Sequence, residues 1–189
     1  MRLPLLTPDQ LSDEQKKLYA DMKDGIQSKF NAFEAVSEAG ELLGPWNPWL
    51  HAPRIGGAIW DLTKAMSMEA TLPEESRQVA ILVTGARYDA AYEIYAHVAV
   101  GKVAGLDEAT MSTICSGSRP SNLSKEAGVA YDVAYVLAGG KQLPRVTYDL
   151  AIETFGQKGA QELIYLVGLY CLVSVVLNGF AVPVPAEAQ

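Results

Sequence analysis

The chain has 189 residues, 49% of them hydrophobic and 20% charged, so it can fold as one domain around a buried core. Its 15 basic and 22 acidic residues give a formal net charge of −7, which argues against nucleic-acid binding and against a polybasic membrane anchor. The two cysteines, Cys115 and Cys171, form no CxxC pair. This excludes a disulfide framework and a thiolate zinc cluster, and it fits a reducing, cytoplasmic location.

The remaining pattern predicts helices and no alternating strands. Ser12 and Gln15 have the spacing of a capping box, Pro73 precedes two first-turn acids, and Gly105 is typical of a helix stop. We expect helices over residues 12–24, 54–68, 73–88, 90–104, 107–114, 124–137, 144–155 and 157–177. Residues 40–53, rich in Gly, Pro and aromatic side chains, are expected to be irregular. The predicted fold class is therefore all-α.

One segment near the C-terminus has the composition of a membrane span. No residue from Leu163 to Ala186 is charged, and the stretch 163–177 is apolar on all sides. Ser174 and Asn178 interrupt the apolar run, no Lys or Arg flanks its distal end, and the N-terminus lacks the apolar run of a signal peptide. We therefore expect a buried helix of a bundle and no membrane contact.

The candidate chemistry lies on the predicted helix over residues 90–104. Glu93 and His97 are four residues apart, so they are about 40° apart around the helix axis and share one face. A carboxylate beside an imidazole stabilises the protonated ring and orients it, as acid–base catalysis requires. Pairs at this spacing also occur on exposed helix faces, but the surrounding Val and Ala residues predict a mostly buried helix. A buried polar pair is typical of a functional site.

Other catalytic signatures are missing from the sequence. It contains no Walker motif, GxGxxG turn, HExxH or GxSxG. One His beside one Glu is too few for a catalytic zinc site unless distant positions or another subunit add ligands. We therefore expect neither a metal nor a cofactor.

The segment RQVAILVTGARYDAAYEIYAHVAVGKVAGLDEATM, residues 77–111, resembles the carboxymuconolactone decarboxylase family of the AhpD-like superfamily. The shared features are an apolar helix, then Tyr-Glu-x-x-x-His, then a small-residue tail that ends in Gly-Leu. The upstream segment GPWNPWLHAPRIGG and the last segment, from Phe155, resemble two further blocks of that family in the expected order. The likeness covers residues 43–189 as the core of a single domain, after an N-terminal helical extension over residues 1–42.

The resemblance implies an AhpD-like helical bundle that assembles as a homo-oligomer, a trimer or a hexamer, with pockets near the subunit contacts. It also implies a lyase of aromatic compound catabolism that acts on a small molecule. The sequence departs from the family at several positions. Peroxidase-type members carry Cys-x-x-Cys-x-x-x-His, where this chain has Ala90 and Glu93, so thiol peroxidase activity is disfavoured.

The family's acidic residue nineteen positions before the histidine is Gln78 here, and its Trp after Tyr-Glu is Ile94. An amide keeps the hydrogen bonds of a carboxylate but cannot accept a proton in the same way. Glu74 and Glu75, one turn earlier, could substitute for the acid but are better explained as first-turn helix acids. These changes leave the decarboxylation itself in doubt.

We therefore predict a decarboxylase-like carbon–carbon lyase that acts on a small lactone or keto acid without a cofactor. His97 would transfer the proton, Glu93 would orient the ring and hold its charge, and Gln78 would hydrogen-bond a substrate oxygen. Apolar walls, a polar contact and a carboxylate-binding guanidinium group are expected from Trp46, Trp49, His51, Arg54 and Arg87. His51 has the alternative of capping the next helix, and the two tryptophans have the alternative of filling the core.

Two other classes of function stay open on the sequence alone. One is a related isomerase or hydrolase of the same fold, and the other is a non-catalytic oligomeric protein that binds a small molecule. Turnover would separate an enzyme from a binder. A pocket that contains both Glu93 and His97 would favour an enzyme.

Overall fold

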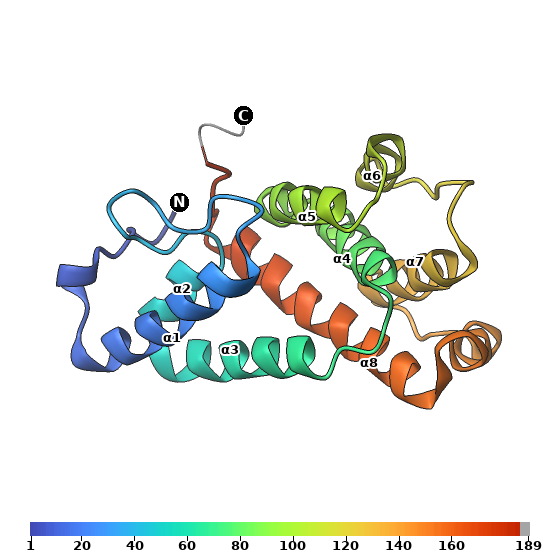
Figure 1. Cartoon of the computed structure of the whole chain (residues 1–189), viewed down its shortest axis with the longest axis horizontal. Coiled ribbons are helices and arrows are strands. Elements are labelled where there is room, and N and C mark those ends of the chain that lie inside the picture. The colour runs from blue at the N-terminus through green and yellow to red at the C-terminus, as the bar shows by residue number, and fades with distance from the viewer. Residues whose placement is uncertain (186–189) are drawn as a thin grey trace.

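The structure is a computed structural model that describes residues 1–185, and within this range the fold is all-helical, as predicted, apart from one isolated bridge between Val36 and Leu42. The helices, shown in Figure 1, are η1 (Pro8–Gln10), α1 (Asp13–Lys29), α2 (Trp46–His51), α3 (Pro53–Met68), α4 (Glu74–Tyr88), α5 (Ala91–Val103), α6 (Glu108–Cys115), α7 (Lys125–Ala138) and α8 (Arg145–Gly179).

Local signals in the sequence set several helix ends. The Ser12 hydroxyl accepts a hydrogen bond from the backbone N–H of Gln15, whose side chain accepts one from the backbone N–H of Ser12. This is the predicted capping box at the start of α1. Ser124 caps α7 through the N–H of Ala127. Gly105, with a φ of +91°, follows the end of α5.

The structure corrects the prediction in two places. α1 continues past the expected end at Asp24 to Lys29. Gly25 within it lies against the ring of Trp60, where a Cβ atom would come within 2.4 Å of a ring carbon. The expected irregular segment 40–53 contains the buried helix α2. Asn47 anchors this helix, because its Nδ2 donates a hydrogen bond to the carbonyl of Pro4 over 3.1 Å.

The two helices predicted near the C-terminus are present and meet at Gly156, where φ is 69° and ψ is 175°. Both carry the label α8, which therefore has a kink at this residue. By length and composition, α8 is the one helix within residues 1–185 that could cross a membrane. Half of its most apolar window is buried inside the fold, where α8 packs against α4 and α7. Core helices of globular bundles have this pattern.

Two hydrophobic clusters make up the core, and α8 contributes residues to both. The first cluster is built by α4, α6, α7 and the middle of α8. The second is built by α1, α2, parts of α3 and α5, and the end of α8. Leu11, Met22 and Leu42 of the N-terminal extension are buried in the second cluster, so the extension packs directly on the core. The candidate site lies between the clusters, where α3, α4, α5 and α8 meet.

Candidate functional site

His97 on α5 is oriented by two side chains of α4. The Nε2 of Gln78 donates a hydrogen bond to Oε1 of Glu74 over 2.7 Å, which fixes the orientation of the amide. The other end of the amide, Oε1, lies 2.7 Å from Nδ1 of His97. Because an amide oxygen only accepts hydrogen bonds, we assign the proton to Nδ1, which leaves the lone pair of the neutral ring on Nε2. Nε2 is therefore the ring nitrogen that can exchange a proton with a ligand.

Glu93 lies one turn before His97, and its Oε1 is 3.1 Å from Nε2 of the ring. Both side chains are buried. The contact is an ion pair when the ring is protonated, but its direction lies outside hydrogen-bond geometry, so Oε1 has no hydrogen-bond donor among the described residues. A buried acceptor without a donor costs about 1–3 kcal/mol, and such atoms are typical of sites that receive a ligand.

Arg77, next to Gln78 on α4, is the cation of the site. Its Nη1 pairs with Oε1 of Glu162 on α8, and its Nε is 3.8 Å from Oε2 of Glu74. Its Nη2 donates a hydrogen bond to the carbonyl of Met66 over 3.4 Å. The positive charge is thus neutralised by carboxylates that belong to the protein itself.

Glu162 also fastens the loop between α3 and α4. Its Oε2 accepts hydrogen bonds from the backbone N–H and the hydroxyl of Thr71, over 2.6 and 2.7 Å, and from the N–H of Leu72 over 3.1 Å. The loop, α4 and α8 are therefore tied together through one buried carboxylate. This network holds Arg77 and the neighbouring Gln78 in place.

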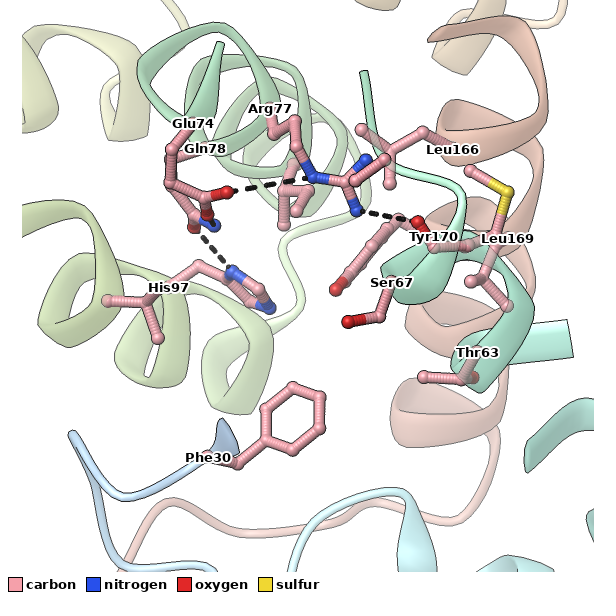
Figure 2. Close-up of a pocket in the computed structure, with 14 residues that line it drawn as sticks. Phe30, Thr63, Ser67, Glu74, Arg77, Gln78, His97, Leu166, Leu169 and Tyr170 are labelled. Atoms are coloured by element: carbon pink, nitrogen blue, oxygen red, sulfur yellow. Dashed lines mark hydrogen bonds and ion pairs between the residues drawn. The ribbon is translucent and has the colours of Figure 1, made fainter. Parts of the chain in front are cut away.

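Two adjoining cavities share the ring of His97 as a wall. The main cavity has a volume of about 230 Å³, and Figure 2 shows Glu74, Arg77 and Gln78 along one side of it, with Tyr170 and Ser67 facing them. The second cavity, which we call the aromatic slot, has a volume of about 40 Å³. The residues that line both cavities are Phe30, Thr63, His97, Leu169 and Tyr170.

Tyr170 adds a hydrogen-bond donor to this space. Its ring meets the ring of His97 edge to face, with the ring centres 5.0 Å apart. Burial raises the pKa of Tyr170 well above its ordinary value. The nearby charges of Glu93 and Glu74 raise this pKa further, whereas the charge of Arg77 lowers it by less than Glu93 raises it. The phenol therefore keeps its proton in neutral and mildly alkaline solution.

The aromatic slot is walled by flat rings and by Glu93. Phe33 stacks on Trp46, with the ring centres 6.2 Å apart, and Phe30 meets Trp46 edge-on at 5.6 Å. Trp49 also lines the slot. The indole Nε1 atoms of Trp46 and Trp49 are buried and have no acceptor among the described residues. Buried indole N–H groups normally find a partner, so these two are candidate contacts for a ligand.

The structure brings five of the expected site residues together around the two cavities: Glu93, His97, Gln78, Trp46 and Trp49. Their roles toward a substrate stay predictions. His51, Arg54 and Arg87 lie outside both cavities, and we correct the contacts expected of them.

Each of these three residues lies elsewhere because of the packing of its own helix. Nε2 of His51 is 2.9 Å from the carbonyl of Pro4, and α3 begins without a side-chain cap, so His51 does not cap that helix either. Arg54 is exposed in the first turn of α3. Arg87 lies over the ring of Tyr135, 4.8 Å from its centre.

Sequence reasoning missed three residues of the site and interpreted a fourth too narrowly. Glu74 is in the first turn of α4, as expected, but it also orients the amide of Gln78. Arg77 and Glu162 could have been found as lone charges at the edges of apolar stretches. Tyr170 gave no signal, because it lies inside a long uncharged run where any side chain fits a core position.

The cysteines take no part in the site. Cys115 and Cys171 line neither cavity, and burial raises the pKa of both thiols, which disfavours the reactive thiolate. Within residues 1–185, no group of three or more His, Cys, Asp or Glu side chains is placed to hold a metal ion. The polar chemistry of the cavities is therefore that of carboxylate, imidazole, amide, guanidinium and hydroxyl groups.

The arrangement is that of an all-helical bundle with a buried acid–base pair in a cavity wall, and solved structures show which bundle it is. One is an uncharacterized peroxidase-related protein from Ralstonia eutropha JMP134, described as an alkylhydroperoxidase AhpD core. Its superposition covers 99% of this chain and 93% of that protein, with a TM-score of 0.76 and 14% sequence identity. Another is the debrominase Bmp8, solved as a variant in complex with 2,3,4-tribromopyrrole. Its superposition covers 100% of this chain and 93% of the debrominase, with a TM-score of 0.74 and 11% sequence identity. The chain therefore has the AhpD-like fold.

No protein-family profile matches the sequence, and no curated protein matches it. The identities to the solved structures are low, so they show the fold alone. Membership in the carboxymuconolactone decarboxylase family stays a prediction.

Proposed function

We propose that this protein is a cofactor-free acid–base enzyme that forms or protonates an enolate in a small carbonyl compound such as a lactone or ketone. The observation that carries the proposal is the position of His97 in a cavity wall, with Nδ1 held by Gln78 and Nε2 beside Oε1 of Glu93. Imidazole and carboxylate groups at such positions are the usual acids and bases of enzymes.

In this mechanism, Glu93 or Nε2 of His97 accepts a proton from the carbon next to the carbonyl group. The electron pair of that C–H bond moves toward the carbonyl oxygen, which becomes an enolate. The phenol of Tyr170, which keeps its proton, lies against His97 and is placed to donate a hydrogen bond to this oxygen. The protonated base then returns its proton to carbon.

Where the proton returns decides the class of reaction. Its return to a different carbon gives an isomerase, whereas protonation of an enolate left by carbon–carbon cleavage gives a lyase. The predicted decarboxylase-like lyase is of the second kind, and its substrate carries a carboxylate. Arg54 and Arg87, which were expected to bind that group, lie outside the cavities, and Arg77 is paired with Glu162. This observation favours the isomerase as a second candidate.

The solved structures are consistent with an enzyme that takes a small ring. The debrominase with this fold binds 2,3,4-tribromopyrrole, a small flat molecule. The cavities of this chain are also small and partly walled by aromatic rings. The test must distinguish this enzyme from a non-catalytic protein with the same cavities that only binds a small molecule.

Exchange of carbon-bound hydrogen in D2O tests the proposal, because enolate formation exchanges the hydrogen next to the carbonyl even without net turnover. The measurement is NMR of a panel of unsaturated lactones, ketones and keto acids with the purified protein. We expect His97→Ala to lower the exchange rate by about 10²–10⁴-fold, the usual contribution of a general acid or base. Glu93→Gln is expected to lower it as well.

His51→Ala is the matched control, because it removes the chain's other histidine, which lies outside both cavities. Its exchange rate should equal that of the unchanged protein. Equal rates in all four proteins would contradict the catalytic role of Glu93 and His97, and no exchange with any compound would favour a binding protein. Loss of exchange after treatment with a chelator would contradict the cofactor-free part of the proposal.

A further inference from the structure

The charges around the cavities indicate what kind of molecule they accept. We infer that the main cavity and the aromatic slot together select an uncharged, flat carbonyl compound and reject its carboxylate counterpart. This inference rests on the proposed function for the reaction itself, and it deepens that proposal by naming the substrate class.

The first argument is the balance of charge at the cavity walls. Among the described residues that line the cavities, Arg77 is the one Lys or Arg, whereas Glu74 and Glu93 are both present. Arg77 is also paired with Glu162 behind the wall, so the two cavities and this pair together hold three carboxylates and one guanidinium group. The cavity is therefore negative when the ring of His97 is neutral, and it stays negative when the ring is protonated.

The second argument is that Arg77 has little left to offer an anion. Nη1 pairs with Glu162, Nη2 donates to the carbonyl of Met66, and Nε faces Glu74. A carboxylate that entered the cavity would lose its hydration and approach Glu74 and Glu93 without gaining a free cation.

An uncharged carbonyl group is not repelled by these carboxylates and loses much less hydration than a carboxylate does. Its oxygen needs only hydrogen-bond donors, which the phenol of Tyr170 and the protonated form of His97 supply. Polar groups of the ligand can therefore be satisfied in a cavity that repels a full negative charge.

The third argument is the shape of the aromatic slot. A space of about 40 Å³ between aromatic rings admits the edge of a flat ring more readily than a puckered or branched group. The indole N–H groups of Trp46 and Trp49 lack acceptors within the described part of the chain, and Oε1 of Glu93 lacks a donor. A flat ligand with an acceptor on its ring edge could supply the partner that the indole N–H groups lack, whereas Oε1 of Glu93 would need a hydrogen that the ligand donates.

A thiol placed in the cavity measures its electrostatic selection without any substrate. Ser67 lines the main cavity, and Met68, the next residue of α3, is exposed. We would introduce Ser67→Cys and, as the matched control, Met68→Cys into a chain that carries Cys115→Ala and Cys171→Ala. Each protein reacts with a cationic and an anionic methanethiosulfonate of similar size, and the two rates are normalised to those of a free thiol in solution.

We expect the ratio of cationic to anionic rates to be at least about tenfold higher at position 67 than at position 68. The net charge of −7 acts on both positions and therefore cancels in this comparison. Glu74→Gln should reduce the ratio at position 67 and leave that at position 68 unchanged. Equal ratios at the two positions would overturn the inference, even if His97 proved essential for exchange.

Equilibrium binding tests the ligand class directly. Calorimetry would compare methyl coumalate, a flat unsaturated lactone ester, with coumalate, its carboxylate, and with the ring-saturated ester. We expect the flat ester to bind at least about tenfold more tightly than either of the others. Binding of the carboxylate as tight as that of the ester, equal binding of the saturated ester, or binding of none of the three would overturn the substrate class. Because no turnover is measured, this outcome is separate from failure of the proposed reaction.

Discussion

At the scale of single residues, Arg77 is the side chain on which the wall of the site most depends. Its side chain is 10% exposed and that of Glu162 is 7% exposed, so the pair is buried. Glu162 in turn holds the backbone of Thr71 and Leu72. Without the guanidinium group, an ionised carboxylate would remain in the interior with only neutral donors. Charges in this state are among the most destabilising features of a folded protein.

We therefore expect Arg77→Leu to lower the free energy of unfolding by about 3–5 kcal/mol, measured by urea denaturation. Lys158→Ala is the control, because the pair of Lys158 with Glu69 is at the surface, and its cost should stay within about 1 kcal/mol. A double variant that adds Glu162→Gln should recover much of the stability, since no unpaired charge remains and the amide oxygen can still accept from Thr71 and Leu72. Similar costs for Arg77→Leu and Lys158→Ala would show that the buried pair is not structurally important.

At the scale of elements, α8 organises the molecule because it contributes to both hydrophobic clusters and to the site. Its direction is set at Gly156, whose φ of 69° and ψ of 175° lie in a region that essentially only glycine adopts. Gly168, further along α8, has ordinary helical geometry. An added Cβ atom would meet nothing within 4 Å at either glycine, so the two positions differ in their backbone alone.

This contrast predicts opposite effects of the same substitution. Gly156→Ala should lower the free energy of unfolding by about 1–3 kcal/mol, because alanine is strained in this conformation. Gly168→Ala should raise it by about 0.5–1 kcal/mol, because alanine loses less backbone freedom than glycine on entering a helix. Thermal and urea denaturation of both variants measures the difference. Effects of the same sign would contradict the role given to Gly156.

At the scale of the whole molecule, α8 has an apolar side that the fold leaves exposed. Tyr165, Leu172 and Val175 are exposed and lie on one face of the helix. Burial of this face between copies would account for the uncharged part of α8, residues 163–179, because only half of the most apolar window of this helix is buried within one chain. We therefore propose that the homo-oligomer implied by the resemblance forms through this face of α8. A cytoplasmic location stays a prediction.

Sedimentation velocity tests the assembly. We expect the unchanged protein to sediment as a trimer or hexamer, and Leu172→Glu to shift it toward smaller species, because a carboxylate would be buried in the contact. Val103→Glu is the control, since Val103 is exposed and belongs to another helix, α5. A monomeric unchanged protein at all concentrations would contradict the proposal.

The sequence alone determined features that depend on short-range interactions. The capping box of α1, the glycine after α5 and the break at Gly156 follow from hydrogen bonds and backbone preferences within a few residues. The pairing of Glu93 with His97 follows in the same way, because side chains four apart on a helix are neighbours whatever surrounds them. The all-α fold and the centre of the candidate site were therefore predictable.

Only the tertiary structure decided which distant residues surround that centre. Arg77 and Glu162 are 85 positions apart, and Tyr170 reaches His97 from another helix. The packing of α8, which contributes to both clusters, sets these contacts, and the packing of their own helices leaves His51, Arg54 and Arg87 outside the cavities. The sign of the charge in the cavity is a sum over several helices. No local pattern in the sequence contains that sum, and it is the property that limits what the site can bind.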